Sequence, residues 1–336
     1  MTNLPCVSIL LPVRDEERFL PAALDSLRCQ TLTSWELVCI DDGSTDATAQ
    51  ILADAAERDE RIRIMSSSGE GLVTALNVGL AACRAPLVAR MDGDDISHPR
   101  RLELQAAKMT ADPDLALVAC RFRHFPRGQV RMGMLGYEAW QNALDSPEAI
   151  MHDLYVESPF VHPSVMFRKC VVDAIGGYRD KGWAEDYDLW LRMAAAGARF
   201  ARLPEVLFFW RERPDRITRT RPEYSAEAFR SCKMAHLRNG FLKGVGEVIL
   251  AGAGLEGRAW SRVLAGEKIR VALWVDVDPR KKGRTLHGSQ IVGPDDVSPG
   301  NWKMLATVGV RGARHQVRNW ARSAGFSEGE DFLCVA

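Results

Sequence analysis

Short apolar segments alternate with amphipathic segments over the first 120 residues, and this alternation constrains the fold more than any other feature. The predicted strands are residues 7–11, 36–40, 61–65, 86–89 and 115–120. The predicted helices are residues 15–29, 46–58, 72–83 and a segment that begins at Ser97, with Ser97 as cap and Pro99 just inside. Strands that alternate with helices in this way favour an α/β fold with a mainly parallel sheet covered on both faces.

Polar residues follow three of these predicted strands. The first group is Pro12, Arg14, Asp15 and Glu16, the second is Asp41 and Asp42, and the third is Arg90, Asp92, Asp94 and Asp95. In parallel sheets, ligands bind beyond the carboxyl ends of the strands. The three groups are therefore expected to share one edge of one sheet and to form a binding site there.

The third group carries three carboxylates within four residues. Carboxylates this close raise one another's pKa unless a cation lies between them. Oxygen ligands on a tight turn suit Mg²⁺ or Mn²⁺, and both ions tend to share substrate phosphates. Taken alone, the stretch could also be an ordinary acidic turn.

A second pair of carboxylates, Glu185 and Asp186, precedes an amphipathic segment about 90 residues later. Tyr187 and Trp190 lie on its apolar face and are predicted to be core residues. Acidic residues are favoured at a helix start by the helix dipole, so a capping role is one interpretation. The other is a general base, because a carboxylate within hydrogen-bond reach activates a hydroxyl nucleophile.

These motifs, in this order, resemble those of a family 2 glycosyltransferase with the GT-A fold. The resemblance covers about residues 5–220. It rests on residues 7–17, 41–46 and 90–105 for the nucleotide-sugar half, and on residues 160–168, 176–178 and 185–192 for the acceptor half.

The resemblance implies a role for each matching residue. The segment from Pro12 to Glu16 and the pair Asp41 and Asp42 would hold the base and ribose of the donor. Asp92 and Asp94 would be the D-x-D pair, with Asp94 the more direct metal ligand, and Asp186 would be the general base. The implied reaction is metal-dependent, inverting transfer of a sugar from a nucleoside-diphosphate sugar to a glycan or lipid-linked acceptor in cell-surface polysaccharide synthesis.

The sequence departs from the family pattern after the predicted strand at residues 205–210. The family usually has an arginine here and then a histidine, whereas this chain has Arg211, Arg213 and Arg216 and no histidine. These arginines could donate to phosphate in its place, or the loop could be solvated. His162 is expected either near the acceptor or diphosphate or in a structural role.

Residues 244–336 are predicted to form a second, small Rossmann-like domain. The G-x-G-x-x-G pattern of Gly252, Gly254 and Gly257 follows a predicted strand, and Asp276 comes 19 residues after Gly257. The segment resembles the lead domain of bacterial sugar acyltransferases. It would either bind NAD(P) or serve as a packing or partner module. The predicted boundaries are residues 1–221, a helical connector at 222–243, and 244–336.

Composition limits the other classes of function. The net charge is zero, and no apolar run approaches the roughly 20 residues of a membrane span. Residues 202–243 hold ten basic against five acidic residues, which could face phosphates or an anionic membrane but more often form a solvated helix face. The eight scattered cysteines indicate reduced core residues, not disulfides or a zinc site.

We therefore expect a cytoplasmic protein, peripheral to the membrane at most, with no nucleic-acid partner and with an oligomeric state that the sequence leaves open. Two alternatives to a transferase remain. One is a nucleotide-sugar-binding regulator without turnover, and the other is an NAD-linked sugar-modifying enzyme centred on the C-terminal part.

Overall fold

The computed structural model describes residues 4–67, 69–300, 302–310 and 312–336. The chain divides into two compact units. The first contains the residues up to Ile150 together with Pro159–Lys181 and Glu185–Arg221, and the second contains Met151–Ser158, Gly182–Ala184 and Pro222–Ala336. Each unit is described by itself below.

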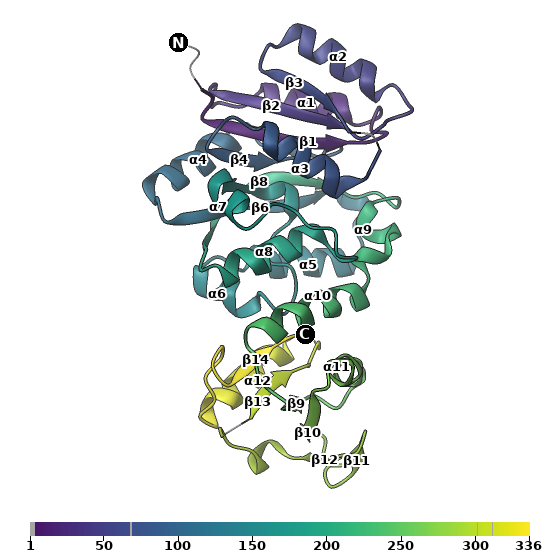
Figure 1. Cartoon of the computed structure of the whole chain (residues 1–336), viewed down its shortest axis with the longest axis vertical. Helices are drawn as coiled ribbons and strands as arrows, with labels where there is room; N and C mark the ends of the chain where they lie inside the picture. The colour runs from purple at the N-terminus through teal and green to yellow at the C-terminus, as the bar shows by residue number, and fades with distance from the viewer. Residues whose placement is uncertain (1–3, 68, 301, 311) are drawn as a thin grey trace. The chain divides into compact units, whose positions relative to one another are not determined.

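An eight-stranded sheet forms the centre of the first unit. Its strands, in spatial order, are β3 (Ile62–Ser66), β2 (Trp35–Asp41), β1 (Val7–Val13), β4 (Leu87–Arg90), β7 (Val165–Arg168), β6 (Leu115–Phe125), β8 (Arg199–Arg211) and β5 (Ile96–Ser97). Figure 1 shows β3, β2, β1 and β4 side by side. Neighbouring strands within this group of four are parallel, and β6 is parallel to β8. Strand β7 is antiparallel to both β4 and β6, and β5 is antiparallel to β8. The predicted mainly parallel sheet is confirmed.

Helices and short 3₁₀ segments connect these strands. The first unit has α1 (Leu20–Arg28), α2 (Thr48–Arg58), α3 (Leu72–Ala82), α4 (Arg101–Ala111), α5 (Met132–Asn142), α7 (Lys169–Ala174), α8 (Glu185–Ala195), α9 (Ile217–Thr220), η1 (Arg127–Gln129) and η2 (His162–Ser164), and α6 (Pro147–Asp153) runs from it into the second unit. Every residue of β1 is buried, which is the burial expected of a central parallel strand covered on both faces.

The local structure corrects three expectations. β1 continues through Pro12 to Val13, because the paired strand β2 accompanies it that far. The first helix begins at Leu20 and not at Asp15. Asp15 has a φ of 53°, a backbone angle outside the range of a right-handed α-helix. Ser97 is not a helix cap: it belongs to β5, and α4 begins at Arg101.

The second unit has a six-stranded sheet of its own. Its spatial order is β11 (Thr285–Leu286), β12 (Ser289–Val292), β10 (Arg270–Val275), β9 (Glu247–Ala251), β13 (Lys303–Ala306) and β14 (Phe332–Cys334), and its helices are α10 (Ala226–Asn239), α11 (Leu255–Gly266) and α12 (Ala313–Ser323), with η3 (Pro222–Tyr224) and η4 (Pro294–Asp296). All pairs from β12 to β14 are parallel (Figure 1).

Segments outside residues 244–336 contribute to this second unit. Met234 and Leu237 of α10 belong to its hydrophobic core together with Trp260 and Trp274. Asp153 forms an ion pair with Arg318 of α12, with 2.7 Å between the nitrogen and oxygen atoms. The helix that the sequence indicated as a connector therefore packs into this core.

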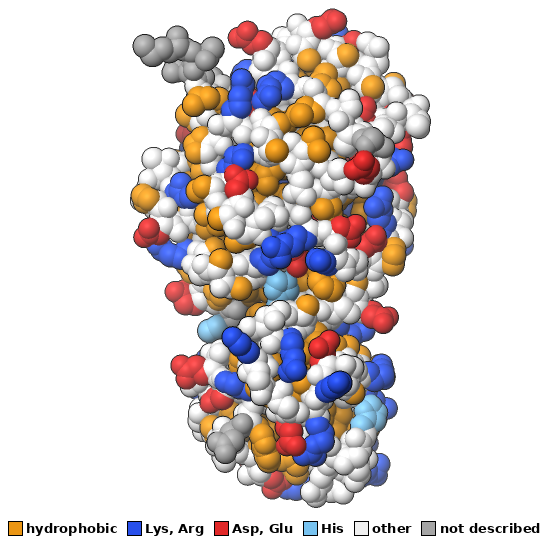
Figure 2. Space-filling model, in the orientation of Figure 1, with side chains coloured by type: hydrophobic (Ala, Val, Ile, Leu, Met, Phe, Trp, Pro, Cys, Tyr) orange, Lys and Arg blue, Asp and Glu red, His pale blue; other side chains and the backbone are white. Residues whose placement is uncertain are grey.

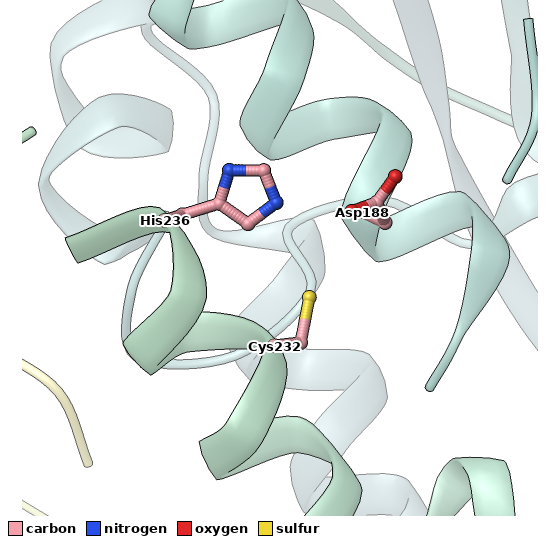
Figure 3. A group of neighbouring side chains, drawn as sticks. All are labelled: Asp188, Cys232 and His236. Atoms are coloured by element: carbon pink, nitrogen blue, oxygen red, sulfur yellow. The ribbon is translucent and has the colours of Figure 1, made fainter. Parts of the chain in front are cut away.

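Five of the eight cysteines are buried. Figure 3 shows Cys232 and His236 one turn apart on α10. Asp188, drawn in the same figure, belongs to α8 of the first unit, where its carboxylate pairs with Arg192 at 2.7 Å. Both residues of this ion pair are buried.

The surface offers no broad patch of one charge on the face that Figure 2 shows, where basic and acidic side chains are interspersed. Among the described residues, no helix combines the length and the apolar character that crossing a membrane requires. The basic stretch at 202–243 does not form a solvated face throughout, because Arg202, Arg216 and Lys233 are buried.

Candidate active site

The turn after β4 holds the three carboxylates of Asp92, Asp94 and Asp95, and each has a different environment. Asp92 forms an ion pair with Arg90, which is itself buried. Asp94 lies 3.2 Å from the guanidinium of Arg213. Asp95 is fully buried, and one of its carboxylate oxygens accepts a hydrogen bond of 2.6 Å from the backbone of Arg211.

Burial is the main electrostatic influence on this turn. It raises the pKa of Asp94 and of Asp95, and the negative charge of neighbouring carboxylates raises both further. Burial also raises the pKa of Glu16 to about 7, with Asp94 and Asp92 adding to the effect and Arg213 opposing it. The turn thus concentrates negative charge that a bound cation would neutralise.

The donor set fits a hard divalent cation. Asp92, Asp94 and Asp95 each offer a carboxylate oxygen, and these atoms lie within 4.8 Å of one another. Oxygen-only ligands on one turn match the preference of Mg²⁺ and Mn²⁺. Arg90 neutralises Asp92 and Arg213 lies beside Asp94, so the expectation that Asp94 is the direct ligand rests on the family resemblance.

A buried polar network fixes the strand that precedes this turn. Arg101 donates to the carbonyl oxygens of Arg90 and Val165, at 2.9 and 3.2 Å, and also to Gln105. Gln105 in turn donates to the carbonyls of Val118 and Ser164. The Arg101 and Gln105 positions of the family motif therefore connect β4, β6 and β7 and support the carboxylate turn from inside the protein.

The predicted base and ribose residues lie where β1 and β2 end. The Asp42 carboxylate accepts hydrogen bonds from Ser67 and from the backbone of Gly71, and Arg14 approaches it at 3.8 Å. Because β1 pairs with both β2 and β4 in parallel, these residues share one sheet edge with the Asp92–Asp95 turn.

Asp15 and Asp41 are partly used to build the adjoining loops. Asp15 accepts from the backbone of Thr45 at 2.7 Å, and Asp41 accepts from that of Ser44 at 2.9 Å. Both carboxylates thus hold the turn after β2 in place. Their predicted role is to bind the nucleotide-sugar donor.

The acceptor-side pair lies at the first turn of α8. Asp186 is partly accessible, and one of its carboxylate oxygens accepts a 2.6 Å hydrogen bond from the backbone of Tyr187. Burial raises the pKa of Asp186 well above its usual range, and the charge of Glu185 raises it further. A partly accessible carboxylate at this position is suited to general-base chemistry. Tyr187 and Trp190 are fully buried, as predicted.

His162 is held by two neighbours. One ring nitrogen lies 2.9 Å from the hydroxyl of Tyr178, and the other lies 3.4 Å from the Glu185 carboxylate. Burial lowers the pKa of His162, and the charge of Arg90 lowers it further. His162 therefore connects Tyr178 to Glu185.

The loop after β8 brings three arginines to the carboxylate turn. The guanidinium of Arg211 lies between the rings of Phe19 and Phe125, 4.4 Å from each. Arg213 pairs with both Glu16 and Asp94, and the buried Arg216 lies 3.6 Å above Trp210. The sequence offered all three arginines as possible phosphate donors, and no local pattern showed which of them reaches the carboxylates.

The glycine loop of the second unit is tightly packed. Gly252 has a φ of 111°, and a side chain at Gly257 would lie 1.9 Å from the Gly252 carbonyl oxygen. The Asp276 carboxylate accepts from the backbone of Ala253 and pairs with Lys281 at 2.7 Å. Gly254 has open space beside it. The acid expected to bind a ribose is thus already engaged within the unit.

A mainly parallel sheet with carboxylates on one edge, and a second carboxylate pair at the start of a later helix, is the arrangement expected of a glycosyltransferase of the GT-A class. The comparison with known families agrees. The model of "Glycosyl transferase family 2" matches residues 8–176, and the chain belongs to this family. It is accordingly a glycosyltransferase.

Curated relatives of similar length support this assignment. The chain is 31% identical over 249 residues to the putative glycosyltransferase EpsE of Bacillus subtilis, covering 70% of this chain and 85% of that protein. It is 31% identical over 206 residues to a UDP-Gal:alpha-D-GlcNAc-diphosphoundecaprenol beta-1,3-galactosyltransferase of Escherichia coli, covering 60% and 73%.

Solved structures show the same fold. TarS 1-349 of S. aureus in complex with UDP-GlcNAc superposes with a TM-score of 0.55 at 18% identity, covering 77% of this chain and 70% of that one. The mannosyltransferase PcManGT of Pyrobaculum calidifontis, in complex with GDP-Man and Mn²⁺, gives a TM-score of 0.50 at 21% identity and covers 80% and 70%.

Proposed function

We propose that the protein is a metal-dependent, inverting glycosyltransferase of cell-surface polysaccharide synthesis, moving a sugar from a nucleoside-diphosphate sugar to a glycan or lipid-linked acceptor. The observation that carries the proposal is the presence of an oxygen-only carboxylate cluster at Asp92–Asp95 and of a separate carboxylate pair, Glu185 and Asp186, in the first turn of α8. Two similar proteins support the substrate class, since one acts on a diphosphoundecaprenol acceptor and another was solved with UDP-GlcNAc.

On the donor side, Asp42 and Arg14 would hold the base and ribose, and Arg211 would face the diphosphate. A divalent ion bound at Asp94 would supply charge neutralisation for the leaving diphosphate. Arg90 keeps Asp92 paired and directs its carboxylate along the turn. Arg101 holds the backbone of Arg90, so the donor turn keeps its position.

On the acceptor side, Asp186 would take the proton of the attacking hydroxyl. Its partly accessible position fits that task, and the backbone of Tyr187 orients the carboxylate. A base on the face opposite the leaving diphosphate makes the reaction a single displacement with inversion. Glu185 and His162 would position this carboxylate and the acceptor.

Asp94→Asn tests the metal site. The variant should lose Mn²⁺-dependent binding of UDP or GDP in calorimetric titration while keeping the fold, because the amide cannot neutralise the ion. Asp114→Asn is a matched control, since Asp114 is an exposed acid whose partner is Arg199. Unchanged affinity and unchanged metal dependence in Asp94→Asn would refute the metal role.

Turnover distinguishes this enzyme from a nucleotide-sugar-binding regulator. Hydrolysis of UDP- or GDP-sugars in the presence of Mn²⁺, with release of the nucleoside diphosphate, supports an active transferase. Nucleotide binding without hydrolysis or transfer under the same conditions would favour the regulator.

For the second unit we propose a structural module rather than a dinucleotide site. A ribose would have to displace Lys281 and the backbone of Ala253 from Asp276, both of which stabilise the loop. Titration of the protein with NAD⁺ and NADP⁺ tests this. Saturable binding that Gly254→Val abolishes would establish a dinucleotide site instead.

A further inference from the structure

The side chain of Arg213 pairs with two acids of the predicted donor site, Glu16 and Asp94. Its two terminal nitrogens contact both carboxylate oxygens of Glu16, and its Nε lies 3.2 Å from the Asp94 carboxylate. The side chain is mostly buried, with 19% of its surface exposed. A single guanidinium thus bridges the residue expected to hold a metal ion and an acid from the donor-binding segment.

We propose that Arg213 is an exchangeable counter-ion of the donor site: it neutralises Asp94 and Glu16 when no donor is bound, and it transfers to the donor diphosphate when the metal ion takes Asp94. The inference rests on the proposed metal and diphosphate site. It adds to that site a residue through which metal binding and nucleotide binding assist one another.

Charge balance is the physical reason for an exchange. Asp94 with Arg213 already beside it is a poorer ligand for a divalent ion, because the two cations repel and compete for the same oxygen. A diphosphate brings new negative charge, and a guanidinium pairs with phosphate oxygens as well as with carboxylates. Nucleotide binding would therefore remove the competitor of the metal ion.

The other two arginines near the turn pack against aromatic rings. Arg211 is enclosed by two aromatic rings and donates to the backbone carbonyl of Asp94, not to its carboxylate. Arg216 is buried against Trp210 and paired with Glu212 at 3.7 Å. Arg213 is held by carboxylates instead: it pairs with Glu16 and Asp94 and lies 3.7 Å from Asp215, while the ring of Phe19 is 5.7 Å away.

The test is the mutual dependence of Mn²⁺ and nucleotide binding in Arg213→Met, a substitution that removes the charge and keeps the length. Mn²⁺ affinity is measured by calorimetry without nucleotide and at saturating UDP or GDP, and the ratio of the two is compared with wild type. Arg219→Met is the control, because Arg219 lies nearby in α9 but pairs with Glu212.

We expect Arg213→Met to bind Mn²⁺ about tenfold more tightly without nucleotide. The ratio of the Mn²⁺ affinity at saturating nucleotide to the Mn²⁺ affinity without nucleotide should fall about tenfold or more, within the usual range of coupling between sites. Arg219→Met should leave the ratio unchanged. An equal change in Mn²⁺ affinity with and without nucleotide would show a fixed charge and overturn the exchange, while the metal site itself would stand. Absence of Mn²⁺ binding by wild type, even with nucleotide, would overturn both proposals.

Discussion

Replacing Asp186 by asparagine should separate catalysis from stability, because the two effects have opposite signs. Asparagine has the shape of aspartate, and its carbonyl oxygen can still accept the 2.6 Å hydrogen bond from the backbone of Tyr187. The substitution therefore keeps the geometry at the start of α8 and removes only the ability to take a proton. Turnover should fall by the roughly 10²–10⁴ that a general base contributes.

Donor affinity should change little in this variant, because the carboxylate turn at Asp92–Asp95 is untouched. Glu185→Gln is the matched control and should lose less turnover, since Glu185 pairs with His162 and positions the base rather than acting as the base. The assay is sugar transfer to the true acceptor, with donor affinity measured separately by titration.

The stability effect follows from the raised pKa of Asp186. A carboxyl group that binds its proton more tightly in the folded than in the unfolded state contributes stability below its unfolded pKa, and this contribution is lost as pH rises through the folded pKa. At pH 8 the charged carboxylate is therefore a cost that asparagine removes. Because the side chain is partly accessible, we expect the melting temperature to rise only by about 2 °C at pH 8, with the gain disappearing near pH 4.

Near-normal turnover of Asp186→Asn with its true acceptor would refute this reasoning and make Glu185 the candidate base. A melting temperature lowered at pH 8 would show that the carboxylate is stabilised by partners, and would contradict the physical account of its raised pKa.

Three further predictions concern stability. Arg101→Met should destabilise the first unit by about 3–5 kcal/mol in denaturant unfolding, because it leaves buried carbonyl oxygens and a buried glutamine without their donor. Gly257→Ala should lower the melting temperature of the second unit, since the new Cβ would lie 1.9 Å from a backbone carbonyl, whereas Gly266→Ala, with open space around it, should be neutral or stabilising. A fragment of residues 222–336 should give a more dispersed NMR spectrum than one of residues 244–336, because α10 supplies part of its core; equal spectra would contradict this.

The sequence by itself determined the fold class and the position of the donor-side residues. Short apolar runs and helical periodicity predicted the alternating strands and helices, and the parallel arrangement then brought Pro12–Glu16, Asp41–Asp42 and Asp92–Asp95 to one edge. The sequence suffices for this inference, because the carboxyl ends of parallel strands share an edge of the sheet. Boundaries were less certain: Pro12 remained in β1 and Ser97 joined β5, since strand pairing outweighed the turn and cap preferences of single residues.

Only the tertiary structure decided how the charges are paired. Arg213 lies 197 residues from Glu16, and no local pattern distinguishes it from Arg211 or Arg216. The same holds for Lys281, which pairs with the Asp276 of a glycine motif that the sequence left open as a dinucleotide site or a packing module. Residue type and spacing set which groups can form a site, whereas burial and long-range packing set which of them are left to bind a ligand, because the free energy of an ionic group depends on neighbours distant in the chain.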